Sequence, residues 1–407
     1  MAKNTLTRRK LLATSGAVAS LNIVKSGTLF GAENSALSKL SVGFIGMGGQ
    51  IQGHVNNLVN QGQHVAAFCD VDRSQIEKSM DRHKNHVKDC KPYEDYRSLF
   101  EKEKSLDAVV IATPDHWHAP ICKAAMAAGK HVYCEKPLTH TIKEARELRD
   151  LSKASNVVTQ TGNQGSASAN LRRSMELIEA GVFGPIREIH VWHPKHNWPS
   201  GGVRPAGSDP VPEGLNWDFW CGPAPVRPYK QGIYHPVKWR GWYDFGNGFI
   251  GDFCCHSFNL ALRSLHLDYP KRISFTGEGF GTETFAKSCS VKYHFSKNAK
   301  RSHDVELNIY TGGGKDVPPD HAVEAAIKTF GSLPRVGCIF VGDKGMLSSG
   351  LWNSQCYIKM NGEEKYVGEG NHEVSKAIPQ SVPRSKGHMH EWVDACKGNG
   401  KTFADFD

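Results

Sequence analysis

The chain has 407 residues, of which 39% are hydrophobic and 22% are charged, a composition typical of globular proteins rather than of disordered or membrane-embedded chains. Its length favours two domains over one. The net charge of +9 has the sign expected of a nucleic-acid-binding protein, but residues 1–39 hold six basic residues and one acidic residue and so carry +5 of it. The remaining +4 on a body of this size predicts no nucleic-acid partner.

The first 30 residues have the pattern of a twin-arginine export signal. Arg8-Arg9 lies directly before a weakly apolar stretch, residues 11–24, which is diluted by Ser, Thr and Gly. The pattern predicts a partnership with the twin-arginine export machinery and a periplasmic location. A basic amphipathic helix on a cytoplasmic protein is the alternative. Gly31-Ala32 and Ser35-Ala36 are both possible cleavage sites.

The cysteines predict free thiols rather than a disulfide framework. There are eleven, an odd number, and they form no C-x-x-C motif. Together with the export signal, this fits a chain that folds in the reducing cytoplasm and is exported folded. Such a route allows a cofactor to be loaded before export.

From Leu40 onwards, short apolar runs alternate with helical stretches. Strands are expected over 40–46, 64–70, 107–113, 131–135 and 156–160, and helices over 50–60, 74–88, 116–128 and 141–155. This alternation predicts a parallel, doubly wound Rossmann sheet over residues 40–162. Its strands end at one edge, where ligands bind.

The remaining residues, 163–407, are expected to form an α+β domain. A strand is expected over 186–192; nine of the 20 prolines then fall within 194–236, and six of the nine tryptophans within 192–242. Beyond Tyr269, alternating apolar and polar residues predict a large, mostly antiparallel open sheet with one exposed face. Its expected strands cover 272–276, 288–295, 304–310 and 337–341, followed by a polar loop over 362–383 and a short helix over 388–396.

A glycine turn follows the first strand and opens the first helix. Such glycines permit a tight turn and let a pyrophosphate approach the helix N-terminus. An isoleucine stands where the usual motif has its third glycine, which widens the helix–strand contact slightly. The residues expected to bind the cofactor here are Gly46, Gly48, Gly49, Gln50 and Ile51.

Asp70 strengthens this assignment because it ends the second strand about 20 residues later, where an acid can bind the ribose hydroxyls. A carboxylate there also repels a 2′-phosphate, which favours NAD over NADP. Arg73 lies nearby and weakens that preference.

The loop after the strand over 107–113 should border the dinucleotide through Thr113, Pro114 and His118. Its His-x-His pair lacks a nearby acid cluster, so no metal site is predicted. We expect Asp115 to cap the following helix and the tryptophan between the histidines to pack.

Two further motifs carry the chemistry. Lys136 follows the strand over 131–135, beside the expected nicotinamide position. An ammonium there can bind a substrate hydroxyl and stabilise the alkoxide that develops. Taken alone, such a lysine is more often solvated. Asp252 and His256 lie four residues apart, so on a helix they share one face. The acid can orient the imidazole, which suits a general base. A helix cap and a packed histidine are the alternative.

Taken together, these motifs resemble the Gfo/Idh/MocA oxidoreductases, the relatives of glucose–fructose oxidoreductase and inositol dehydrogenase, over nearly all of residues 40–407. The resemblance implies a C-terminal open sheet that often mediates homo-oligomers, here a dimer or tetramer. It implies that Lys136 and His256 are the catalytic lysine and histidine, that Asp252 assists the histidine, and that Glu135 borders the cofactor. Residues 216–225, with Trp239-Arg240, resemble an exported subgroup.

The chain departs from the family pattern at its end. Relatives usually continue beyond the position of Asp407 with a helix that packs back on the Rossmann domain. The sequence is therefore expected to be a truncated form or to lack that brace.

Aromatic residues flanked by polar groups point to a carbohydrate, whose C–H face stacks and whose hydroxyls need partners. Five tryptophans lie in this region with several basic residues: Trp198, Trp217, Trp220, Trp239 and Trp242, with His193, Lys195, His196 and Arg240. We expect two or three of the five to be structural anchors. Trp198, Trp239 and Arg240 are expected to bind substrate together with Lys136, Asp252 and His256.

The resulting hypothesis is oxidation of a secondary alcohol of a sugar or cyclitol, with His256 taking the hydroxyl proton and Lys136 polarising the oxygen. Because free NAD is scarce outside the cytoplasm, an exported enzyme should carry it tightly bound. One alternative is a redox-neutral glycosidase that oxidises, eliminates and re-reduces with bound NAD. The other is a non-catalytic dinucleotide-binding protein.

Overall fold

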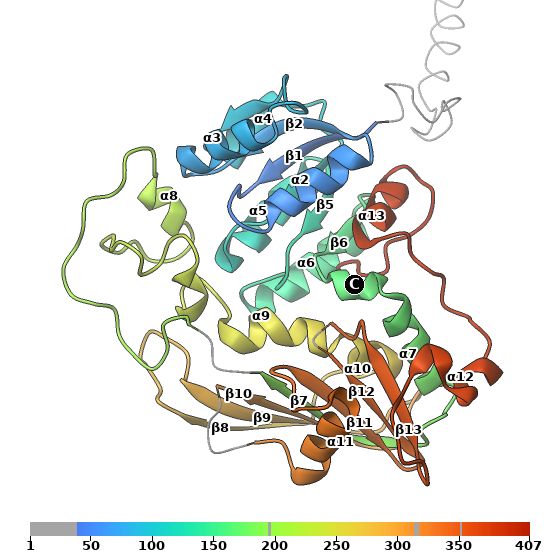
Figure 1. The fold of residues 1–407 in the computed structure, drawn as a ribbon. Helices are drawn as coiled ribbons and strands as arrows, with labels where there is room; N and C mark the ends of the chain where they lie inside the picture. Colours follow the sequence, from blue (N-terminus) through green and yellow to red (C-terminus); the bar gives the residue numbers. More distant parts are fainter. Residues whose placement is uncertain (1–38, 194–196, 313–316, 351) are drawn as a thin grey trace, which may run out of the picture.

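The computed structural model describes residues 39–193, 197–312, 317–350 and 352–407, arranged as a Rossmann domain above a second domain (Figure 1). The expected export signal lies outside the described residues, as do Lys195 and His196. Among the described helices, none is long and apolar enough to cross a membrane. All eleven cysteines are free, which confirms the prediction.

The predicted parallel, doubly wound sheet is confirmed, and it has six strands in the order β3-β2-β1-β4-β5-β6. The strands are β1 (Ser41–Ile45), β2 (His64–Cys69), β3 (Lys91–Tyr93), β4 (Ala108–Ile111), β5 (His131–Cys134) and β6 (Thr159–Thr161). The sequence analysis missed β3 because it has three residues, one of them Pro92, and none of them is fully buried. The strand order reverses between β1 and β4, which places a crevice at their carboxyl ends.

Helices cover both faces of this sheet. α2 (Ile51–Asn60) and α3 (Arg73–Arg82) pack on one face, and α4 (Tyr96–Lys102), α5 (Asp115–Ala127) and α6 (Ile142–Ala154) pack on the other. The sequence did not predict α4, and it extended α3 too far. Beyond Arg82, the buried Val87 and Cys90 reach the core from a loop instead.

The second domain is built on an eight-stranded sheet in the order β14-β13-β12-β11-β7-β10-β9-β8, antiparallel except between β7 and β10. Its strands are β7 (Ile186–His193), β8 (Arg272–Glu278), β9 (Ser288–Phe295), β10 (Val305–Thr311), β11 (Gly337–Gly342), β12 (Gly345–Ser349), β13 (Cys356–Met360) and β14 (Val367–Gly368). The predicted mostly antiparallel sheet is confirmed, although β12 to β14 were not predicted.

The two faces of this sheet differ. The inner face, toward the Rossmann domain, packs against α7 (Ala169–Glu179), α9 (Gly248–Ser257) and α10 (Asn259–Ser264). The outer face carries α11 (Asp320–Phe330), which packs through alanines onto Trp192 and Ile339. It stays open at β8, where Ser274 and Thr276 lie on this face and are exposed, so the prediction of one exposed face holds in part.

Residues 197–247, here called the tryptophan segment, form a small core of their own. It contains α8 (Trp217–Cys221) and a 3-10 helix (Lys238–Gly241), and Figure 1 shows it reaching from the second domain up to α3. Asn216 N–H donates to Val71 O and Arg73 N–H donates to Gly214 O, both at 2.9 Å. The segment is therefore fixed to the end of β2.

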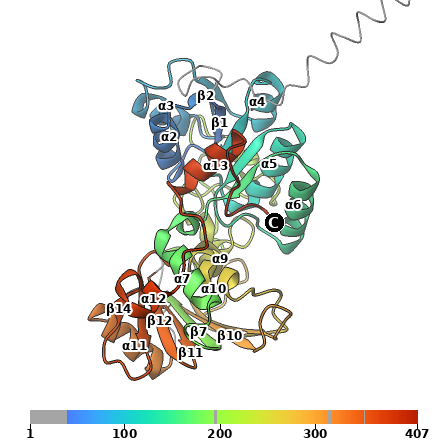
Figure 2. The same ribbon diagram turned by 90° about the vertical axis from the view of Figure 1, so that its right-hand side faces the viewer.

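The C-terminal residues return to the Rossmann domain. Figure 2 shows α13 (His388–Cys396) beside the Rossmann sheet. It contributes Met389, Trp392 and Val393 to the same core as β1 and α2, and the Trp392 side chain is fully buried. Thr161 N–H donates to Ala404 O at 2.7 Å. Residues 388–407 therefore lie against the Rossmann domain, although the expected boundary assigned them to the second domain. Three short helices complete the described chain: 3-10 helices at Gln164–Ala167 and Glu369–Asn371, and α12 (Glu373–Ala377).

Candidate active site

A cavity of about 660 Å³ lies between the two domains, at the carboxyl edge of the Rossmann sheet. Most of the predicted site residues line it: Gly46, Gly48, Gly49, Gln50, Asp70, Thr113, Pro114, Glu135, Lys136, Trp198, Trp239, Arg240, Asp252 and His256. Residues of both domains thus meet at one place.

The glycine turn forms a cradle at one end of this cavity. Gly46 has φ of +86°, and a Cβ there would lie 2.7 Å from Thr113 N, so only glycine fits. At Gly48 and Gly49 a Cβ would meet no atom within 4 Å, which leaves open space above the turn. No side chain caps α2 at Gln50. The uncapped first turn and the open space fit a pyrophosphate.

Asp70 ties the end of β2 to this turn. Its Oδ2 accepts from Met47 N–H at 2.6 Å and its Oδ1 accepts from Asp72 N–H at 2.9 Å. Burial raises the pKa of Asp70 to about 6. Arg73 pairs with Glu94 at 3.5 Å on the surface, and Glu94 also lines the cavity, so two carboxylates border this end.

Lys136 crosses from the Rossmann domain to the second domain. Its Nζ donates to Asp252 Oδ1 at 2.9 Å and to the Asp252 carbonyl at 3.0 Å. Burial acts to lower the pKa of Lys136, but Asp252 and other neighbouring groups outweigh it and the net pKa is raised. Lys136 is therefore a cation at neutral pH.

Glu135 anchors the backbone below this lysine. Its Oε1 lies 2.7 Å from His54 Nε2 and accepts from Gln164 Nε2 at 2.8 Å. Burial acts to raise its pKa, but the hydrogen bond and charge of His54 together with Lys136 outweigh it and the net pKa is lowered. Gly162 leaves room for this carboxylate, because a Cβ there would lie 2.7 Å from Glu135 Cδ.

His256 lies one turn after Asp252 on α9, but Asn163 rather than Asp252 orients it. His256 Nδ1 lies 3.0 Å from Asn163 Oδ1, and Asn163 Nδ2 donates to Cys255 O at 2.8 Å, which fixes the amide so that Nδ1 must carry the proton. Burial, followed by the charge of Lys136, lowers the pKa of His256 to about 4. The ring is therefore neutral, with the Nε2 lone pair available to accept a proton.

The expected assistance of His256 by Asp252 is corrected by these contacts. The Asp252 carboxylate accepts from Lys136 and, at 3.2 Å, from Arg240 Nε. Two cations thus share one carboxylate, and Asp252 orients them instead of the histidine.

The tryptophans divide between the cavity and the core. Arg240 lies over the rings of Trp239 at 4.2 Å and Trp198 at 5.7 Å, and all three line the cavity. Trp217 and Trp242 lie within the core of the tryptophan segment and do not line the cavity, whereas Trp220 and Trp239 do both. Two or three anchors among five were expected, and this division agrees.

Two predicted cofactor residues lie off the cavity. The Ile51 side chain is fully buried in the Rossmann core, because α2 turns that face toward β1. The buried His118 ring lies 2.9 Å from Thr113 O and 2.7 Å from Pro137 O, so it holds two loops together instead of facing the cavity. Asp115 does not cap α5; its Oδ2 accepts from the backbone and side chain of Asn247, across the domain boundary.

Several side chains at the site were not predicted, and four of them lie close to the predicted catalytic residues. Gln164, Phe253 and Trp352 line the cavity, and Asn163 supports His256. Asn163 and Gln164 follow β6 at the carboxyl edge, so the rule used for the other strand ends could have found them. Trp352 follows β12, a strand the sequence did not reveal, and lies 6.0 Å from the His256 ring.

Two family profiles match the chain in sequence order. The profile described as "Oxidoreductase family, NAD-binding Rossmann fold" covers residues 40–163, and that described as "Oxidoreductase family, C-terminal alpha/beta domain" covers residues 169–274. The chain belongs to the Gfo/Idh/MocA oxidoreductase family. The predicted resemblance is confirmed, and with it an NAD-binding Rossmann fold.

The chain is similar to known proteins both in sequence and in structure. An alpha-N-acetylgalactosaminidase of Tannerella forsythia is 32% identical over 154 residues, which are 36% of this chain and 33% of that protein, so the match spans about a third of the relative's length. The WlbA dehydrogenase of Bordetella pertussis, solved with NADH and UDP-GlcNAcA, has a TM-score of 0.60 at 14% identity over 90% of this chain and 91% of the other. An inositol dehydrogenase homolog of Azotobacter vinelandii, complexed with NADH and myo-inositol, has a TM-score of 0.58 at 19% identity over 89% of this chain and 86% of the other. These two structures share the fold of this chain.

Proposed function

We propose that this protein oxidises a secondary alcohol of a sugar or cyclitol with NAD. The observation that carries the proposal is the placement of a cationic lysine and a neutral histidine on one cavity: Lys136 is held by Asp252, and His256 keeps a proton-accepting Nε2. A hydroxyl group that meets both can be deprotonated and held as an alkoxide.

NAD fits the Rossmann side of the cavity. The cradle of Gly48 and Gly49 at the start of α2 accommodates the pyrophosphate, and Asp70 is placed to accept from the ribose hydroxyls. Bound NAD supplies the acceptor for a hydride. Asp70 and Glu94 together repel a 2′-phosphate, while Arg73 is engaged with Glu94, which supports NAD over NADP.

The protein's own groups handle the proton. His256 accepts it at Nε2, and the imidazolium that results donates from Nδ1 to Asn163 Oδ1. Lys136 donates to the substrate oxygen and stabilises the negative charge that develops on it. Asp252 keeps both Lys136 and Arg240 aligned at this end of the cavity.

The far side of the cavity suits a polyhydroxylated ring. Trp198, Trp239 and Phe253 offer apolar faces, and Arg240 offers donors beside them. The ligands of the two structural neighbours, UDP-GlcNAcA and myo-inositol, are of this chemical class. They support the proposed substrate class without naming the substrate.

A panel of sugars and cyclitols tests the proposal. Each compound is incubated with the full chain and NAD, and the nicotinamide absorbance and the sugar products are followed together. We expect at least one compound to yield NADH and its keto product in equal amounts. The proposal is refuted if Lys136→Ala and His256→Ala both turn over that compound at the wild-type rate.

A redox-neutral glycosidase is the second candidate, favoured by the similarity to an alpha-N-acetylgalactosaminidase. The same panel, extended with glycosides, separates the two: a glycosidase of this type releases free sugar without net NADH. A non-catalytic protein would bind NAD and change no compound.

Tight cofactor binding is part of the proposal. The tryptophan segment lies against the end of β2 and adds Phe219, Trp220 and His235 to the cavity wall, so it can slow dissociation of NAD. Together with the proposed twin-arginine export, this favours loading before export. Protein purified from the periplasm should then carry nucleotide, detected by its absorbance after denaturation; empty protein with weak NAD affinity would contradict preloading.

A further inference from the structure

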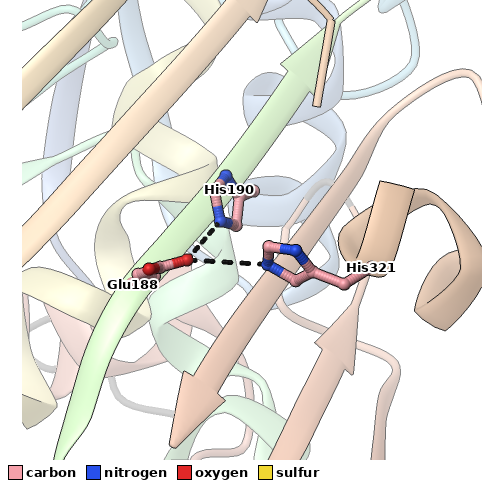
Figure 3. Close-up of side chains that lie close together, drawn as sticks. All are labelled: Glu188, His190 and His321. Atoms are coloured by element: carbon pink, nitrogen blue, oxygen red, sulfur yellow. Dashed lines mark hydrogen bonds and ion pairs between the residues drawn. The ribbon is translucent and has the colours of Figure 1, made fainter. Parts of the chain in front are cut away.

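Three side chains converge on the outer face of the second domain's sheet. Glu188 and His190 come from β7 and His321 comes from the first turn of α11 (Figure 3). Ile189 and Val191 belong to the inner core, so the alternation of β7 turns Glu188 and His190 to the opposite face. The cluster is therefore separate from the proposed active site.

The spacing of the three side chains matches that of metal ligands. Glu188 Oε2 lies 3.2 Å from His190 Nε2 and 3.5 Å from His321 Nε2, and the three ligand atoms all lie within 4.8 Å of one another. Around a tetrahedral zinc ion with bonds of about 2.0–2.1 Å, neighbouring ligand atoms are roughly 3.3 Å apart. Both distances from Glu188 are close to this value.

The surroundings of His190 favour a fixed ligand. Its side chain is buried, and its Nδ1 lies 3.2 Å from the Tyr310 hydroxyl, with the two rings stacked at 6.1 Å. A partner on one ring nitrogen sets the tautomer and aims the other nitrogen at the ion, as is usual for metal-ligating histidines. Nε2 is the nitrogen that faces Glu188 and His321.

A second cavity, of about 630 Å³, adjoins the cluster. Glu188, His190 and His321 form part of its wall, together with residues of the neighbouring strands β8, β9 and β10. Three protein ligands leave one tetrahedral position unfilled, and this cavity gives water or a small anion access to it.

We propose that Glu188, His190 and His321 bind a divalent first-row transition-metal ion, zinc above others. Two imidazoles and one carboxylate suit zinc, and they exclude the hard ions that prefer oxygen alone. The ion fastens the start of α11 to the middle of the sheet. The sequence did not predict this metal site, because Glu188 and His190 lie on β7 and His321 lies on α11, far apart along the chain.

Metal titration of the full chain tests this proposal. Protein stripped with a chelator is titrated with zinc, and bound metal is counted by mass spectrometry. We expect one zinc per chain, and we expect cobalt at the same site to give the visible absorption of a tetrahedral complex. The Glu188→Gln and His321→Ala variants should each lose at least about 100-fold in zinc affinity, beyond the roughly 10–100-fold cost of losing an outer partner.

These two variants can be expected to fold, because both side chains are 46% exposed. His86→Ala, which removes an exposed histidine of the Rossmann domain, is the matched control and should keep wild-type affinity. Zinc should also raise the melting temperature of the wild type and the control but not of His321→Ala. NAD affinity should be equal in all four proteins. Absence of stoichiometric zinc from the wild type, or wild-type affinity in both cluster variants, overturns the proposal.

Discussion

The two walls of the interdomain cavity are built on different principles. The Rossmann wall presents groups at the ends of successive strands, each within a short motif. The opposite wall combines the tryptophan segment, α9 and Trp352, which come together only through tertiary packing. The first wall thus follows from βαβ geometry, and the second depends on long-range contacts.

The walls also differ in the groups they offer. The Rossmann wall presents backbone N–H groups and the carboxylates of Asp70 and Glu94. The opposite wall uses long charged and aromatic side chains. Lys136 joins the two, since it belongs to the first wall and bonds to Asp252 of the second. Substitutions at this junction should therefore have larger effects than substitutions within either wall.

Lys136→Met should have the largest effect on turnover. Methionine keeps much of the side-chain length but removes the donor to the substrate oxygen, so kcat should fall by about 10²–10⁴-fold. NAD affinity, measured by calorimetry, should stay near wild type, because the cradle lies on a different motif. Lys143→Met, on an exposed face of α6, is the control. Equal losses in NAD affinity and turnover would show that Lys136 serves cofactor binding instead.

The pH dependence of kcat/KM should report His256. Only the neutral ring accepts a proton, so the rate should be independent of pH above the histidine pKa and fall about tenfold per pH unit below it. With that pKa lowered to about 4, the acid limb should lie near pH 4, rather than near the ordinary value of about 6.5. The profile is measured over the range in which circular dichroism shows the fold intact. A limb near pH 6.5 would contradict the buried, Asn163-bonded ring.

Asp70→Asn addresses the Rossmann wall alone. The change keeps the side-chain shape but removes the charge, so NAD affinity should fall roughly 10–100-fold, the range for a hydrogen bond to a charged group. Discrimination against NADP should fall with it. Asp89→Asn, exposed on the same domain, serves as the control. An unchanged ratio of NAD to NADP affinity would mean that Asp70 serves only to bind Met47 N–H.

The same contrast explains what the sequence could predict. Gly46, Asp70 and Lys136 were found because each follows an apolar run, and parallel strands bring such positions to one edge. The sequence also found Asp252 and His256 but paired them with each other. A spacing of four residues says that two side chains share a helix face, yet it cannot reveal that Lys136 and Asn163 approach that face from another domain.

Other errors had local causes. The prediction of Ile51 as a cofactor contact took the whole motif as a binding surface, while α2 must bury one face. The assignment of residues 388–407 to the second domain missed that α13, though short, carries Trp392 into the Rossmann core. Shape complementarity of this kind leaves no periodic pattern in the sequence.

The smallest expected effect concerns stability. It tests how much Glu135 contributes to holding Lys136 in place. In Gly162→Ala the new Cβ would lie 2.7 Å from Glu135 Cδ, so the carboxylate or the backbone must move. Overpacking of this kind costs about 1–3 kcal/mol of unfolding free energy. Gly53→Ala is the matched control, because a Cβ there meets nothing within 4 Å on the exposed side of α2, and it should stabilise by about 0.5–1 kcal/mol. Urea unfolding measures the change in unfolding free energy of both variants.

Because Glu135 also fixes the backbone that carries Lys136, Gly162→Ala should lower turnover as well, whereas Gly53→Ala should not. If Gly162→Ala is as stable and as active as the wild type, the position of Lys136 depends on Asp252 alone, and the junction is held from the second wall only.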